Sequence, residues 1–226
     1  IQTTLSIAIS EEGESNVDKY KSAKAVIDIA LGRGGDQAII KQNGKYYFFG
    51  GRTQEVEKRT RVKARIVSQA LEELVNSSSN VLIMGHTNSD IDAMGSAMGV
   101  YRFVKAIGKD ASIVNETTGT SLDTFIQDLK DIEDYQGVLV DKNTALSKIS
   151  SDSLLIVVDT DKKNYVEVPE LLTKTDKIAV IDHHRRGTDY IENAMLTFHE
   201  VYASSACELV TEIVEFSERA IHLTTF

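Results

Sequence analysis

At residues 81–92 the chain reads VLIMGHTNSDID, an apolar run of strand length followed at once by polar and acidic side chains. Residues 154–159, LLIVVD, and residues 178–184, IAVIDHH, repeat this arrangement. Short runs rich in Val, Ile and Leu are typical of strands that are buried on both faces of a parallel sheet. A fourth run, ASIV at residues 111–114, reads as a further strand.

Helix-like patterns separate these strands, at residues 94–107, 121–133 and 166–173. The alternation of strands and helices predicts an α/β fold with a mostly parallel, Rossmann-like sheet. Ligands of such open sheets bind beyond the carboxyl ends of the strands. The residues that follow each strand are therefore the candidates for function.

Three of the predicted strands deliver carboxylates and imidazoles to one edge of the sheet. Imidazole nitrogen combined with carboxylate oxygen suits Mn²⁺, Fe²⁺ or Zn²⁺ better than Mg²⁺ or Ca²⁺. Burying many acids without a cation is costly, because like charges disfavour one another's ionised forms. The pattern predicts a two-metal site, in which ions about 3.5–4 Å apart clamp the oxygens of a phosphoryl group. The residues expected there are His86, Asp90, Asp92, Asp159, Asp182, His183 and His184.

Each of these acids also has a purely structural interpretation. A single Asp after a strand is commonly a helix cap or a turn former. Asp90 in particular precedes a helix that we expect to begin near Ile91. Each residue alone favours the structural interpretation, whereas the convergence of three strand ends favours the metal site.

The first part of the chain has a different pattern. Residues 3–9 alternate like a strand, residues 17–31 have a helical period, and the Gly-rich residues 32–36 end that helix. Residues 37–41 and 45–49 predict a hairpin that turns at Asn43-Gly44. The Gly-rich stretch follows a helix and lacks a Lys-Ser/Thr pair, which excludes a phosphate-binding P-loop.

Residues 58–79 predict a connecting helix. Its basic run at residues 58–65 is interpreted as a solvated helix face. The apolar stripe that we expect to be buried consists of Val62, Ile66, Ala70, Leu71, Leu74 and Val75.

Composition narrows the class of protein. The 226 residues include 42% hydrophobic residues and carry a formal net charge of −9, as in an ordinary soluble globular protein. The acidic balance argues against binding to duplex nucleic acid, and no apolar run is long enough to span a bilayer. The single cysteine, Cys207, excludes an internal disulfide and is expected to be a small buried residue. Because the chain begins with Ile1, we expect it to be a piece of a longer protein.

The motifs His86-x3-Asp90-x-Asp92, Asp159 and Asp182-His183-His184 resemble motifs I to III of the DHH phosphoesterase superfamily over about residues 81–216. The first region resembles the C-terminal half of a GGDEF domain, although the Gly-Gly-Asp-Glu-Phe signature is absent. This combination is similar to membrane-anchored cyclic-di-AMP phosphodiesterases with a degenerate GGDEF domain. The resemblance implies a partial GGDEF-like α+β domain at 1–57, a connecting helix at 58–79 and an incomplete DHH domain at 80–226.

The resemblance also implies a role for each site residue. His86, Asp90 and Asp159 would hold one Mn²⁺, and Asp92, Asp159 and His183 would hold a second. Asp182 would orient an imidazole, and His184 would face the phosphate. Arg185 and Arg186 could receive phosphate oxygens or remain solvated. Ser204 and Ser205 are expected to cap the helix at residues 207–216, with substrate contact as the less favoured role.

The chain departs from the family pattern at three points. Ser89 stands where Pro is frequent, and Asp161 stands where the cyclic-dinucleotide enzymes commonly have His. The family also supplies a further metal-binding Asp beyond the last helix, whereas no Asp follows Asp189. We therefore expect most of a metal centre, with its closing ligand absent.

The function implied is Mn²⁺-dependent hydrolysis of cyclic-di-AMP to the linear dinucleotide. The alternatives are an oligoribonuclease or adenosine-bisphosphate phosphatase, or a nucleotide-sensing regulatory module with weak catalysis. The expected partner is a cyclic dinucleotide, with a homodimer as a possibility. The membrane would be contacted only through segments outside this chain, on the cytoplasmic side.

Overall fold

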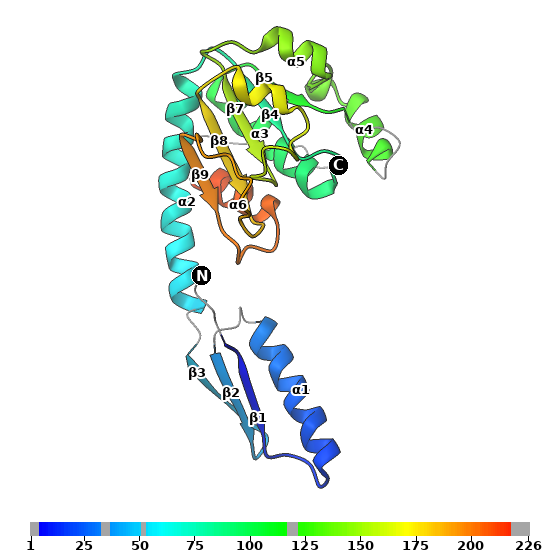
Figure 1. The fold of residues 1–226 in the computed structure, drawn as a ribbon, viewed down its shortest axis with the longest axis vertical. Helices are drawn as coiled ribbons and strands as arrows, with labels where there is room; N and C mark the ends of the chain where they lie inside the picture. The colour runs from blue at the N-terminus through cyan, green and yellow to red at the C-terminus, as the bar shows by residue number, and fades with distance from the viewer. Residues whose placement is uncertain (1–4, 33–36, 51–52, 117–121, 218–226) are drawn as a thin grey trace. The chain divides into compact units, whose positions relative to one another are not determined.

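The computed structural model describes residues 5–32, 37–50, 53–116 and 122–217 (Figure 1). The chain divides into two compact units, residues 1–60 and residues 61–226.

The first unit is a three-stranded sheet with one helix. Strand β1 (Ile7–Ser10) is parallel to β2 (Gln37–Gln42), which forms an antiparallel hairpin with β3 (Lys45–Gly50). Asn43 and Gly44 turn the hairpin with φ values of 52° and 73°, as a two-residue turn of this kind requires. Helix α1 (Asn16–Gly32) packs on the sheet through a small core that includes Val26, Ala30 and Ile39.

The predicted helix and hairpin of this unit are therefore confirmed. The start of the predicted strand at residues 3–9 and the Gly-rich residues 33–36 lie outside the described residues.

The second unit is built on a six-stranded sheet in the order β6-β5-β4-β7-β8-β9, in which all neighbouring strands are parallel. The predicted parallel sheet is thus confirmed. Its strands are β4 (Val81–Met84), β5 (Ala111–Val114), β6 (Leu139–Val140), β7 (Leu154–Val158), β8 (Ile178–Asp182) and β9 (Leu196–His199).

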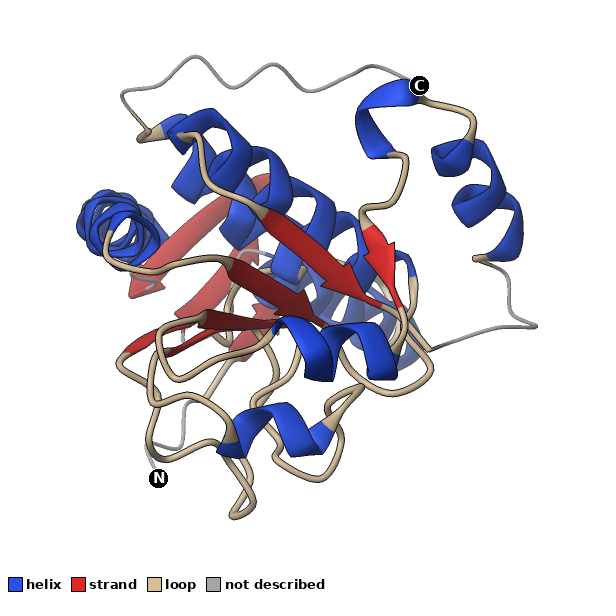
Figure 2. Ribbon diagram, turned by 90° about the horizontal axis from the view of Figure 1, so that it is seen from above, coloured by secondary structure: helices blue, strands red, loops and turns tan. Residues whose placement is uncertain are grey.

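Helices cover both faces of this sheet (Figure 2). Alternate strand residues point to opposite faces, so that Ile83 and Ile156 belong to one core and Leu82 and Leu155 to another. The first core is closed by α2, α3, α4 and α6, and the second by α5 and η2. The helices are α2 (Thr53–Asn76), α3 (Ile91–Ile107), α4 (Asp123–Lys130), α5 (Lys142–Lys148) and α6 (Ala206–Glu215), with 3₁₀ turns η1 (Glu133–Tyr135) and η2 (Pro169–Thr173).

The strand order brings the candidate residues together. After β4 the chain adds β5 and β6 on one side of that strand, then returns to place β7, β8 and β9 on the other. The carboxyl ends of β4 and β7 therefore lie side by side at the point where the direction of winding changes, which is where open sheets bind their ligands.

Two expectations for the helices were wrong. Residues 166–173 form no α-helix, because Pro169 restricts Val168 to an extended backbone (φ −133°) and leaves only the turn η2. Helix α2 begins earlier than predicted, and Val62 and Ile66 are each 61% exposed. In the described part of that helix, the buried apolar side chains are those of Ala64, Val67, Leu71 and Val75.

Within the described residues, no helix is both long and apolar enough to cross a lipid bilayer.

Candidate metal centre

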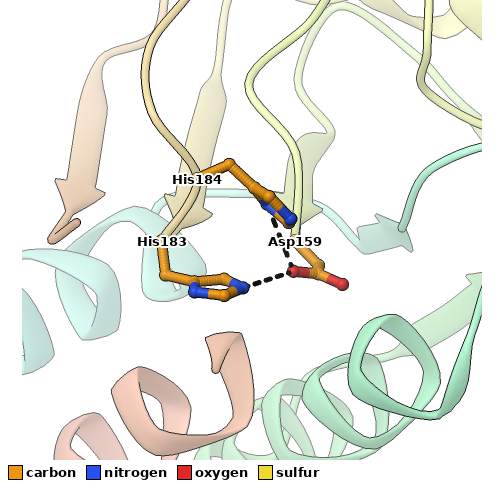
Figure 3. Close-up of side chains that lie close together, drawn as sticks. All are labelled: Asp159, His183 and His184. Carbon is orange, nitrogen blue, oxygen red and sulfur yellow. Dashed lines mark ion pairs between the residues drawn. The ribbon is translucent and has the colours of Figure 1, made fainter. Parts of the chain in front are cut away.

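Asp159 occupies the centre of the site, directly after β7. Its side chain is 2% exposed, and its backbone has the left-handed φ of 60°, which is costly for a residue with a side chain. The carboxylate faces two ways. Its Oδ2 lies 3.6 Å from Nε2 of His86, and its Oδ1 lies 3.5 Å from Nε2 of His183 and 3.6 Å from Nδ1 of His184. Figure 3 shows both imidazoles of the His183-His184 pair turned toward this carboxylate.

His86 is held with one ring nitrogen facing the centre. Its Nδ1 lies 2.9 Å from the carbonyl oxygen of Thr87. Because a carbonyl only accepts hydrogen bonds, Nδ1 carries the proton and Nε2 is the nitrogen left for a cation. The ring stacks on Tyr165, with centroids 5.2 Å apart. His86, Asp90 and Asp159 offer ligand atoms that lie within 4.8 Å of one another.

The charges around His86 change its proton affinity. The Asp159 carboxylate, whose Oδ2 lies 3.6 Å from Nε2, raises the pKa of His86 to about 9. Burial in turn raises the pKa of Asp159, because desolvation penalises its charge. A proton on Nε2 thus occupies the position that a cation would take.

Asp90 fulfils its structural role as predicted. Its Oδ1 accepts hydrogen bonds from the backbone N–H of Asp92 at 2.9 Å and of Ala93 at 3.0 Å, which caps α3. The same oxygen lies 3.8 Å from Nε2 of His86. The cap therefore also fixes a carboxylate beside the imidazole, and the two interpretations of Asp90 are compatible.

Asp92 and His183 form the opposite side of the centre. Oδ2 of Asp92 lies 3.6 Å from Nε2 of His183, whose Nδ1 lies 3.3 Å from the carbonyl oxygen of Ala203. The carboxylate of Asp92 also accepts hydrogen bonds of 2.8 Å from the N–H groups of Ala206 and Cys207, at the start of α6. Burial raises the pKa of Asp92, but these hydrogen bonds outweigh burial and hold the pKa below its usual value.

Asp182 orients His184. The Asp182 side chain is 0% exposed, and its Oδ1 accepts a 2.9 Å hydrogen bond from Nδ1 of His184. Nε2 of His184 is thereby left available, on a side chain that is 53% exposed. This is the arrangement expected of a residue that faces a substrate.

In the site, Oδ1 of Asp159 and Oδ2 of Asp182 are buried carboxylate oxygens without a hydrogen-bond partner among the described residues. An unpaired buried carboxylate oxygen is costly. For Asp159, a cation between Oδ1 and the ring nitrogen of His183 would remove that cost. The donor set therefore fits divalent metal ions.

Ser204 and Ser205 both form hydrogen bonds at the N-terminus of α6. Oγ of Ser205 accepts a 3.1 Å hydrogen bond from the N–H of Glu208. The N–H and Oγ of Ser204 both donate to the Glu208 carboxylate at 2.7 Å. The predicted capping is thus observed. Arg185 is exposed, and its substrate contact stays a prediction.

Sequence reasoning missed the contribution of β9. This strand pairs with β8 so that His199 lies beside Asp182. Nε2 of His199 lies 2.5 Å from the carbonyl oxygen of His184 and 3.9 Å from Oδ2 of Asp182. The sequence LTFH at residues 196–199 contains too few apolar residues to predict a buried strand. The only signal in the sequence was the preceding strand, IAVID at residues 178–182, beside which a further strand could pair.

Comparison with known proteins agrees with this geometry. A sequence model of the DHH family, N-terminal domain, matches residues 80–225. Cyclic-di-AMP phosphodiesterases of Geobacillus thermodenitrificans and Bacillus subtilis are 43% and 41% identical over 226 residues. These alignments cover 99% of this chain but 34% of each relative, so the chain spans about a third of their length.

A solved structure of an exopolyphosphatase-related protein from Bacteroides fragilis has a similar fold. It superposes with a TM-score of 0.52 at 19% identity, covering 66% of this chain and 43% of that one. The strand-end motifs, the candidate metal groups and the match over residues 80–225 lead to one conclusion: the chain belongs to the DHH family.

Proposed function

We propose that the chain is the metal-binding part of a phosphodiesterase that hydrolyses cyclic-di-AMP to linear pApA with two Mn²⁺ ions. The main support is Asp159, whose two carboxylate oxygens face two separate groups of ligand atoms. Relatives with that activity in their names are 41–43% identical to this chain over almost its whole length. Those relatives are about three times as long, so the complete activity is proposed for the parent protein.

The ligands divide between two positions. His86, Asp90 and Asp159 would hold one ion, since their donor atoms already lie within 4.8 Å of one another. Asp92, Asp159 and His183 would hold the other, with Nε2 of His183 at 3.6 Å from Asp92 and 3.5 Å from Asp159. Imidazole and carboxylate donors of this kind suit Mn²⁺.

Bound divalent cations supply acidified water and offset the negative charge of the phosphate. The chain's own residues would contact the phosphate and transfer protons. Asp182 holds His184 through Nδ1, so the imidazolium form of His184 can donate a hydrogen bond or a proton from Nε2 to a phosphate oxygen. The exposed position of His184 permits this contact, and Arg185 next to it is the proposed companion.

We further propose that the first unit is the C-terminal part of a degenerate GGDEF-like domain, in line with its order β1-α1-β2-β3. The parent protein would be anchored through other segments on the cytoplasmic side of a membrane.

The test uses the complete parent protein with Mn²⁺. We expect it to convert cyclic-di-AMP to pApA faster than it cleaves linear oligonucleotides, as followed by chromatography of the products. A metal-loaded parent protein that leaves cyclic-di-AMP intact would contradict the proposal. Faster cleavage of the linear substrates would favour an oligoribonuclease.

A further inference from the structure

An open pocket of about 380 Å³ lies beside the metal centre, at the edge of the sheet formed by β9. Its volume falls within the range of about 300–1,000 Å³ that is usual for small-molecule sites. Among the described residues, those that line it are Lys63, Arg186, Thr197 and His199. All four of these side chains are polar, and Lys63 and Arg186 are cations. The complementary ligand is an anion.

Two contacts hold the Arg186 side chain in the absence of a ligand. Its Nε donates a 3.2 Å hydrogen bond to Oδ2 of Asp161, which is 3% exposed. Its guanidinium carbon also lies 4.9 Å from the ring centroid of Tyr190. Anchoring on a buried carboxylate and an aromatic ring reduces the entropy that ligand binding must remove.

The free end of Arg186 has the geometry of a phosphate site. Its two Nη groups have no protein acceptor among the described residues. Such a guanidinium fork matches two oxygens of a phosphate with parallel hydrogen bonds.

Lys63 supplies the second cation. Its Nζ lies 2.6 Å from Oε1 of Glu200 and 3.3 Å from the carbonyl oxygen of His199. An ammonium group has three N–H donors, and the described residues provide acceptors for two of them, which leaves the third for a ligand.

A metal ion is the less suitable occupant of this region. Asp161, Asp182 and His199 do offer ligand atoms within 4.8 Å of one another. Asp161, however, already binds the Arg186 guanidinium, and the 2.5 Å bond from Nε2 of His199 to a carbonyl oxygen requires a proton on that nitrogen. The cluster therefore anchors a cationic side chain.

We propose that this pocket binds the second, non-reacting phosphate of a dinucleotide whose first phosphate lies at the metal centre. The inference rests on the proposed function. Arg186 follows His184 by two residues, and His199 donates to the backbone of His184, so the two phosphate positions are neighbours. Asp161, which accepts the hydrogen bond from Arg186, is the anchor of the second position.

The first test measures binding to the Mn²⁺-loaded parent protein. Linear pApA carries a 5′-phosphate that ApA lacks. We expect the parent protein to bind pApA about tenfold more tightly than ApA in calorimetric titrations, a ratio typical of one charge-assisted phosphate contact. Arg186→Met should reduce this ratio to about one.

Arg102→Met is the matched control. Arg102 also bonds to an aspartate (Asp134, 3.1 Å) and lies over a tyrosine ring (Tyr135, 5.8 Å), but it does not line the pocket. Its substitution should preserve the ratio. A ratio that survives in Arg186→Met, or that is lost in Arg102→Met, overturns the proposal.

The second test measures turnover. Arg186→Met should raise KM for cyclic-di-AMP about tenfold with little change in kcat, and should leave hydrolysis of bis(p-nitrophenyl) phosphate, which has one phosphate, unchanged. An equal loss of activity with both substrates would mean that Arg186 acts at the metal centre, and would overturn the proposal. If the parent protein cleaves no cyclic-di-AMP, the proposed function fails, whereas the ratio of pApA to ApA binding still decides this inference.

Discussion

At the scale of single residues, Asp159 has several energetically unfavourable features and lies at the centre of the candidate site. It combines a buried charge, an unpaired oxygen and a left-handed backbone. Strain and unpaired charge of this kind persist at functional sites because the surrounding structure enforces them. Asp159 lies at the end of a fully buried strand and donates its N–H to the carbonyl oxygen of Ile181, which fixes its position.

We predict that Asp159→Asn lowers the Mn²⁺ affinity of both positions by about 100-fold or more, because one carboxylate serves both. Calorimetric titration of parent and variant measures this. The metal-free variant should be less stable to urea at neutral pH than the metal-free parent, since the charged imidazole of His86 loses its carboxylate partner. Retention of one tight Mn²⁺ site in the variant would contradict the shared role of Asp159.

The raised pKa of His86 predicts a pH dependence of metal binding. Below about pH 9 the imidazole is charged in the metal-free protein, so metal binding at Nε2 must release that proton. The affinity should therefore rise with pH, by about tenfold per unit between pH 7 and 9 for one released proton. Titrations in buffers of different ionisation enthalpy count the protons. A flat profile over this range would argue against His86 as a ligand.

Residue types and their position after strands predict which side chains lie together, and their role as metal ligands stays a prediction. His86, Asp159 and His183 all point into one centre, as expected from three strand ends. The hydrogen bonds from α6 to Asp92 could not be predicted, because they join residues more than a hundred positions apart. The interpretation of Asp161 likewise needed the fold, since Arg186 reaches it only across a loop.

At the scale of elements, the start of α6 and the site depend on each other. Asp92 on α3 accepts hydrogen bonds from two N–H groups of α6, and Ser205 caps the same helix. A carboxylate at a helix N-terminus is stabilised by the unpaired N–H groups and the helix dipole. Asp92 therefore joins two helices as well as facing a candidate metal position.

We predict that Asp92→Ala costs about 1.5–3 kcal/mol in the free energy of unfolding of the metal-free protein, the usual range for hydrogen bonds to a charged group. Ser205→Ala, the control on the same helix end, should cost about 1 kcal/mol and leave metal binding unchanged. Urea unfolding with and without Mn²⁺ separates the two effects. Equal behaviour of the two variants would mean that Asp92 acts only as a cap.

Element prediction succeeded where the pattern was strong and failed where local chemistry decided. The strands β4, β7 and β8 are continuous apolar runs and were predicted almost to the residue. The two-residue β6, the seven-residue α5 and the partly polar β9 carry too little pattern to be detected. The failed helix at residues 166–173 shows that one proline outweighs a helical period.

At the scale of the whole molecule, the sequence predicted the fold class but not the strand order. Alternating strands and helices imply a parallel sheet, whereas the reversal between β4 and β7 depends on how the helices pack on its two faces. That reversal places the site at the carboxyl ends of two neighbouring strands, β4 and β7.

Removal of metal should therefore lower the folding stability of the whole second unit. Ions that bind only the folded state stabilise it by about 2.7 kcal/mol at a concentration 100 times their Kd. We predict that EDTA lowers the Tm of the parent protein and that excess Mn²⁺ restores it, as measured by calorimetry. Asp159→Asn should show almost no response to either reagent, and an equal response would place the bound ions elsewhere.

The carboxylate of Asp159 has a consequence for how the protein would respond to metal supply. If both ions share this group, the first ion changes the affinity for the second, and the second must change the affinity for the first by the same factor. Repulsion between the ions and the gain from organising the ligands then decide whether loading is cooperative. If organising the ligands outweighs the repulsion, occupancy follows the cellular Mn²⁺ concentration more steeply than two independent sites allow, and the centre then responds to metal availability as well as carrying out chemistry.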